Sequence, residues 1–257
     1  MLEENILLQR VEGEVLVLTL NRPDKYNALS NDLMSLLHDA LIDFDKNDAL
    51  KVCVLTGAGR NFCTGADIKQ FGDAEAQTEE AIAKRAQISM EVNGMAANIS
   101  KPLITSVRGY ALAGGCGVAL SADMVIASDN ALFGYPEVKR GFVPALVMVN
   151  LSKLVGRHRA LQMLLTGDRI PADKALEWGL INFVVPDEDL EEFTMKFAHE
   201  LAEKSTTAVK MIKNLFYEAS ELSLNEGLQK AKAANEAMRK TKDFSEGVGK
   251  FKQGEKA

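Results

Sequence analysis

Two segments rich in small residues could bind negative charge through their backbone. They are Asn61–Ile68 (NFCTGADI) and Gly109–Gly117 (GYALAGGCG), and each follows a short apolar run and is expected to lead into a helix. The first N–H groups of a helix have no acceptor within it, and the helix dipole adds positive potential there. Small side chains let a ligand approach closely. Two such turns that converge on one carbonyl oxygen would form an oxyanion hole.

A simpler interpretation is that these glycines only allow helices to pack closely on strands, and it is preferred for either segment alone. Nucleotide-binding loops fit less well. The segment Gly57–Phe62 (GAGRNF) has a phenylalanine where G-x-G-x-x-G requires its third glycine, and G-x-x-x-x-G-K-[ST] does not occur. The occurrence of two similar turns therefore favours the oxyanion hole.

A group that could move a proton is Glu137, which directly follows Pro136. Burial among apolar groups raises the pKa of a carboxyl and makes it a usable acid or base near neutrality. The apolar residues close to it in sequence are Phe133, Tyr135, Val138, Phe142 and Val143. The alternative is a solvated loop carboxylate beside Lys139 and Arg140.

Cysteines and terminal signals point to a reducing, cytoplasmic setting. Cys53, Cys63 and Cys116 are odd in number and lack C-x-x-C spacing, so neither a disulfide framework nor a metal site is predicted. The acidic start MLEEN does not resemble an export signal. The longest uncharged stretch, residues 109–122, is too short for a membrane span and is interrupted by glycines, so we expect no membrane association.

Composition is that of an ordinary soluble globular protein. The chain has 257 residues, of which 47% are hydrophobic and 26% charged, enough for one large domain or two small ones. Its formal net charge of -6 makes it a poor match for a polyanion, so we expect no nucleic-acid partner.

The order of the predicted elements indicates an α/β fold. Apolar, β-branched runs predict strands at Glu14–Leu20, Lys51–Thr56, Pro102–Val107, Met124–Ala127 and Ile181–Val185. A helix capped by Ser30 or Asn31 follows the first strand, and strand, strand, helix then recurs. From Ala145 onward the pattern is almost wholly helical. We therefore expect a core at residues 1–195 and a helical C-terminal region at residues 196–257.

Four motifs in this order resemble those of the crotonase family, the enoyl-CoA hydratases and isomerases. They are Asn61–Ile68, Gly109–Ala119, Phe133–Glu137 and Leu165–Ile170, and the resemblance covers essentially the whole chain. It implies a spiral of strand-strand-helix turns and a helical C-terminal region used in trimerisation. It also implies an acyl-CoA substrate, no further cofactor, and a homotrimer or a dimer of trimers.

The resemblance also assigns roles to individual residues. The backbone N–H groups of Ala66 and Gly114 match the oxyanion-hole donors, and Glu137 matches a catalytic glutamate. Substrate contacts are expected at Ala28, Thr64, Asp67, Ile68, Gly117 and Phe251. A role for Asp67 as a cap of the following helix competes with its role in binding.

The sequence departs from the hydratase pattern at two places. Gly117 stands where hydratases of the family carry a second catalytic glutamate, and Pro144–Val149 (PALVMV) replaces a glycine-rich run. Hydration uses both carboxylates, whereas a double-bond shift needs one base that removes and returns a proton. These residues favour isomerisation. Hydration of straight or branched enoyl groups, decarboxylation, and a binding protein that has lost activity stay open.

Overall fold

The apolar runs of the sequence form a mostly parallel, six-stranded sheet. The computed structural model describes residues 5–71 and 78–252, and the strand order is β1-β2-β3-β4-β6-β9. Only β1 and β2 are antiparallel neighbours. The strands are β1 (Leu7–Glu12), β2 (Val15–Leu20), β3 (Val52–Gly57), β4 (Leu103–Val107), β6 (Met124–Ser128) and β9 (Phe183–Val185).

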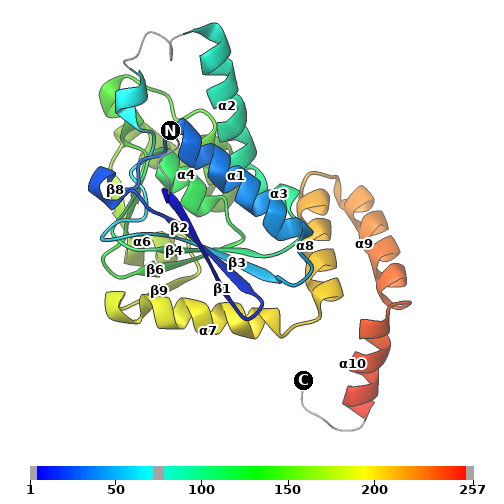
Figure 1. Ribbon diagram of the computed structural model, residues 1–257. Helices are drawn as coiled ribbons and strands as arrows, with labels where there is room; N and C mark the ends of the chain where they lie inside the picture. The colour runs from blue at the N-terminus through cyan, green and yellow to red at the C-terminus, as the bar shows by residue number, and fades with distance from the viewer. Residues whose placement is uncertain (1–4, 72–77, 253–257) are drawn as a thin grey trace.

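Both faces of this sheet are covered, so its central strands are apolar on both sides. Side chains alternate along β2: Leu16 and Leu18 join the larger hydrophobic cluster, and Val15 and Val17 join the smaller one. Helices α1 (Asn31–Lys46) and α4 (Gly114–Leu120) lie over one face, and α7 (Leu190–Ala202) lies over the other (Figure 1). The five strands that the sequence predicted are therefore confirmed.

A second, three-stranded sheet supplies the second strand of each strand-strand-helix repeat. It contains β5 (Tyr110–Leu112), β7 (Leu132–Gly134) and β8 (Arg169–Pro171) in that order. Thus β4 and β5 precede α4, and β6 and β7 precede α5 (Val147–Thr166). The remaining helices of the body are α2 (Glu79–Asn93), α3 (Met95–Asn98) and α6 (Ala172–Glu177).

Three helices at the C-terminal end form an arm that leaves this body. They are α8 (Thr206–Ser220), α9 (Leu224–Met238) and α10 (Lys242–Lys252), and Figure 1 shows α9 and α10 extending away from the sheets. The expected division at residue 195 lies within α7, whose Ala198 and Ala202 belong to the smaller cluster of the core. That division stays a prediction.

Four of the nine strands in the described residues, β1, β5, β7 and β8, were not expected from the sequence, whereas the start of α1 was expected. Ser30 caps α1, because its side chain accepts a hydrogen bond from Leu33 N. Strand β1 has an exposed, polar pattern, and β8 has only three residues with Ile170 buried between exposed neighbours. Neither strand shows the alternation of apolar and polar residues that marks a half-buried strand. The prediction of a single strand after Ala145 was wrong, because β8 lies there as well as β9.

A buried ion pair anchors the arm to the sheet. Lys213 of α8 donates to Asp123 Oδ2 at 2.7 Å and to Lys101 O at 2.6 Å. Asp123 also accepts from Leu103 N at 2.7 Å and from the Tyr217 hydroxyl at 3.0 Å. Desolvation lowers the pKa of Lys213, and the Asp123 carboxylate opposes that shift.

We predict that Lys213→Met lowers the free energy of unfolding by about 3–5 kcal/mol, because it leaves the Asp123 carboxylate without its cation. Urea denaturation measures this change. Lys153→Met is the matched control, since it removes an exposed pair with Glu221 and should cost less than about 1 kcal/mol. Equal losses in the two variants would contradict the anchoring role.

Candidate active site

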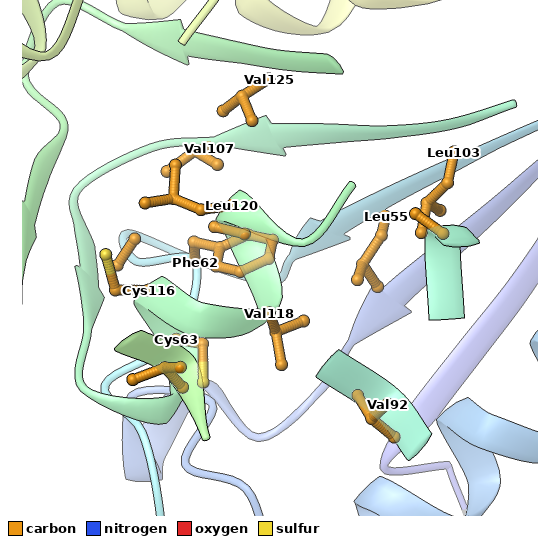
Figure 2. Packing of buried hydrophobic residues seen from close by; sticks show 14 of the residues in the cluster. Leu55, Phe62, Cys63, Val92, Leu103, Val107, Cys116, Val118, Leu120 and Val125 are labelled. Carbon is orange, nitrogen blue, oxygen red and sulfur yellow. The ribbon is translucent and has the colours of Figure 1, made fainter. Parts of the chain in front are cut away.

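Two glycines bring the expected anion-binding turns together. A Cβ added to Gly115 would lie 2.4 Å from Cys63 O, and one added to Gly65 would lie 2.7 Å from the Cβ of Ala113. Backbone hydrogen bonds tie the same segments, because Leu112 N donates to Cys63 O at 2.9 Å. Figure 2 shows the side chain of Cys63 and that of Cys116, which belongs to α4. The start of α4 therefore packs on the turn that contains Ala66, as the sequence suggested.

The N–H of Ala66 has no acceptor among the described residues. Ala66 forms a parallel bridge with Leu29, in which Leu29 N donates to Gly65 O at 2.8 Å and Asp67 N donates to Leu29 O at 3.0 Å. In this parallel bridge Leu29 makes both hydrogen bonds, to the residues on either side of Ala66, and Ala66 makes none to Leu29. This N–H is therefore directed away from the Leu29 segment.

The N–H of Gly114 also has no acceptor among the described residues. Gly114 is the first residue of α4, and a Cβ added to it would lie 3.9 Å from the amide nitrogen of Ala66. The preceding Ala113 has φ 52° and ψ -131°, a strained conformation for a residue with a Cβ. Its own N–H donates to Gly134 O at 2.8 Å, which fixes that peptide.

Glu137 lies in a short 3-10 helix, Pro136–Arg140, and is half-buried. Its Oε2 is buried with no hydrogen-bond partner in the described chain. Desolvation raises the pKa of Glu137, against smaller lowering effects from a backbone hydrogen bond and from the charge of Arg140. Desolvation is the main cause that raises the pKa of the buried Cys116 thiol, and the charge of Glu137 raises it further.

The apolar surroundings expected for Glu137 are only partly present. Phe133 and Tyr135 are fully buried, but Val138, Phe142 and Val143 are 39%, 61% and 67% exposed. The expectation was wrong for the latter three because the chain after Glu137 turns outward. The carboxyl is thus desolvated even though these three side chains are exposed.

No side chain fits at position 117 without a rearrangement. A Cβ added to Gly117 would lie 2.1 Å from Val147 Cγ1 and 2.7 Å from Asn93 Oδ1. Val147 is buried at the start of α5, and Asn93 Oδ1 is buried with no partner in the described chain. The aliphatic run noted in the sequence therefore fills the space beside Gly117.

The other expected substrate contacts separate into two groups. Ala28, Thr64, Asp67 and Ile68 lie around the Leu29–Ala66 bridge, with Asp67 buried and Ile68 58% exposed. Asp67 pairs with Arg22 at 2.7 Å. Phe251 lies in α10, far from α4 within one chain (Figure 1), and its side chain is outside the described part of the structure.

The three cysteines are free, buried thiols. Burial raises the pKa of Cys63 and of Cys116 to about 12, so both stay protonated at neutral pH. Within the described residues, no cluster of three His, Cys, Asp or Glu side chains could hold a metal ion. In the same part of the chain, no helix is long and apolar enough to cross a membrane.

Sequence reasoning missed two polar residues that support the site. Arg22 donates to the Ala28 carbonyl and to Asp67, and Asn27 donates to Ala58 O at 2.9 Å and Asn61 O at 2.8 Å. Asn27 is fully buried with φ 55°, a backbone conformation in which Asn is enriched. Their position just past a strand was the only signal available.

Comparisons with known proteins show which family the chain resembles along nearly its whole length. The sequence model of the family described as enoyl-CoA hydratase/isomerase matches residues 10–257. A probable enoyl-CoA hydratase of Mycobacterium tuberculosis is 34% identical, with 96% of this chain and 95% of the relative covered. The 2,3-dehydroadipyl-CoA hydratase of Escherichia coli is 34% identical, with 94% and 93% covered. An enoyl-CoA hydratase structure from Geobacillus kaustophilus is 36% identical, with a TM-score of 0.90 and 97% and 96% covered.

We predict that Gly65→Ala destabilises the protein more than Gly179→Ala does. Both glycines have positive φ, but only the Cβ at 65 meets other atoms, including Gly114 N at 3.1 Å. The control should lose about 1–2 kcal/mol from backbone conformation, and Gly65→Ala a further 1–3 kcal/mol, roughly, from crowding. Thermal or urea unfolding measures the difference. Equal losses would contradict the close approach of the two turns.

Proposed function

The chain belongs to the enoyl-CoA hydratase/isomerase family, and from this we propose that it shifts a double bond in an acyl-CoA thioester through an enolate. In this proposal the N–H groups of Ala66 and Gly114 bind the thioester oxygen, and Glu137 carries the proton. The substrate brings its own coenzyme A, and no other cofactor is needed.

The reaction begins with a 3-enoyl thioester whose carbonyl oxygen accepts from the two N–H groups. Glu137 removes a proton from C2, and the electron pair moves toward the oxygen. Charge on that oxygen is greater in the enolate than in the thioester, so the two donors stabilise the transition state more than the bound substrate. Glu137 then returns the proton to C4, which leaves a 2-enoyl thioester.

The observation that carries isomerisation is the closed space at position 117. A second carboxylate there would hold the water that hydration requires, but Val147 Cγ1 occupies the place of a Cβ. Val147 neither binds nor deprotonates water, and the neighbouring Asn93 Oδ1 can accept a hydrogen bond from water but is too weak a base to deprotonate it. One carboxylate at Glu137 is sufficient for the proton transfers of a double-bond shift.

Hydration is the second candidate, because the relatives named above are called hydratases. In that case a water would have to be activated by Glu137 alone or by a group outside the Gly117 position. The raised pKa of Glu137 is compatible with either reaction.

Two substrates distinguish the candidates. With a 3-enoyl-CoA we expect conversion to the conjugated 2-enoyl-CoA, seen as rising absorbance of the conjugated thioester. With crotonyl-CoA we expect hydration at least about 100-fold slower than that conversion, in line with the effect of one general acid–base group. Fast hydration of crotonyl-CoA without double-bond migration would overturn isomerisation in favour of hydration.

We predict that Glu137→Gln lowers kcat by about 100- to 10,000-fold while acyl-CoA binding is retained. The variant should fold at least as stably as the parent, because a carboxyl with a raised folded-state pKa destabilises the fold when ionised. Steady-state kinetics and binding calorimetry measure the two effects.

The pH profile provides the control for this variant. The parent should lose kcat/KM as pH falls through the raised pKa of Glu137, above the ordinary carboxyl value of about 4.3. Glu137→Gln should lack this acid limb. Unchanged turnover in the variant would contradict the role of Glu137.

We propose that copies of this chain associate through the C-terminal arm. Its helices α8 and α9 expose apolar side chains, which are Ile212 at 68%, Phe216 at 67%, Leu224 at 80% and Leu228 at 59%. Exposed apolar surface of this kind is typical of protein interfaces. A homotrimer, or a dimer of trimers, would cover it and would allow Phe251 of one copy to reach the substrate of another.

A further inference from the structure

Arg22 is a buried cation that joins two separate segments. It lies just past β2 and is 7% exposed. Its Nη2 donates to Asp67 Oδ2 at 2.7 Å, and its Nη1 donates to the carbonyl oxygen of Ala28. A buried charge is costly unless it is paired and hydrogen-bonded, and here both conditions are met.

These two contacts lie on the two segments that meet at the Leu29–Ala66 bridge. Ala28 precedes Leu29, the bridge partner of Ala66, and Asp67 follows Ala66 directly. One guanidinium therefore holds both sides of the Leu29–Ala66 bridge. The bridge has two hydrogen bonds of its own, which resist separation of the two segments. The contacts from Arg22 also resist sliding of one segment along the other.

A second arginine supports the same segment from another element. Arg85 of α2 donates from Nη1 to Asn31 Oδ1 at 2.8 Å and from Nη2 to Leu29 O at 3.4 Å. Desolvation lowers the pKa of Arg85, and attraction to Asp67 opposes this shift. Arg85 also donates to Gln70 Oε1 at 3.5 Å, so cations from two elements contact both sides of the bridge, and Arg22 makes the shorter hydrogen bonds.

We propose that Arg22 is a positioning residue that aims the Ala66 N–H at the oxygen shared with the Gly114 N–H. This inference rests on the proposed function. The planar fork of arginine can bind a carboxylate and a carbonyl in fixed directions, whereas lysine offers a single nitrogen. Displacement of a reacting geometry by about 1 Å can cost on the order of 100-fold in rate.

The test compares Arg22→Lys with the parent. We expect kcat for the 3-enoyl-CoA to fall by about 10- to 100-fold, with KM changed by less than about threefold. A second readout is the infrared carbonyl stretch of bound butanoyl-CoA, which cannot isomerise. Hydrogen bonds to the oxygen lower that frequency, and in Arg22→Lys it should move back toward the value of the free thioester.

Arg108→Lys is the matched control. Arg108 also pairs with an aspartate and a carbonyl, both of Asp187, but it does not contact the Leu29–Ala66 bridge. Its kcat and carbonyl frequency should equal those of the parent. Asp67→Asn is a second variant that keeps the side-chain shape, and it should move both readouts in the direction of Arg22→Lys.

The outcomes separate the two proposals. A folded Arg22→Lys with parental kcat and carbonyl frequency would overturn the positioning role, as would failure of both Arg22→Lys and Asp67→Asn to fold. If the parent polarises butanoyl-CoA but isomerises no 3-enoyl-CoA, the proposed function fails while the infrared comparison still tests Arg22. If the parent does not polarise the thioester at all, both proposals fail.

Discussion

Two unpaired backbone donors, the N–H groups of Ala66 and Gly114, are the constraint on which the surrounding structure depends. A backbone N–H without an acceptor carries a free-energy cost when it is shielded from water. Both residues are only half-buried, so solvent or a ligand can reach them. The close approach of their turns requires glycine at 65 and at 115, because a Cβ at either would collide with the opposite segment.

The proposed chemistry transfers negative charge from one end of the site to the other. Glu137 loses its charge as it accepts a proton, and the thioester oxygen gains charge at the same time. Partial desolvation makes the carboxylate less stable, while fixed N–H dipoles make the oxyanion more stable, so both environments favour this transfer.

Rigidity around the site comes from polar residues of the loop that follows β2. Arg22 and Asn27 together donate to a carbonyl of their own loop, at Ala28, and to two carbonyls and a carboxylate within residues 58–67. Removing one partner of a buried hydrogen bond costs more free energy than the bond contributes relative to solvation, because the other partner is left unsatisfied. These bonds therefore restrict the loop to one arrangement. The C-terminal arm is held differently, by the single buried cluster around Asp123 and Lys213.

Local patterns in the sequence determined most of the secondary structure. Continuous apolar, β-branched runs predicted the central strands such as Val15–Leu20, and Ser30 predicted the start of α1, because these signals act between near neighbours. The residue types of the candidate site were also readable, since Ala66, Gly114 and Glu137 lie in motifs that resemble a known family. The short strand β8 was not readable, because three residues carry no period.

Only the tertiary structure decided how these residues meet. The unpaired Ala66 N–H follows from a bridge to Leu29, and the closed space at Gly117 follows from Val147 in a helix thirty positions away in sequence. The same is true of the Arg22–Asp67 pair, whose members are 45 residues apart. Contacts at such separations depend on how elements pack, and no local pattern of the sequence specifies which side chains they bring into contact.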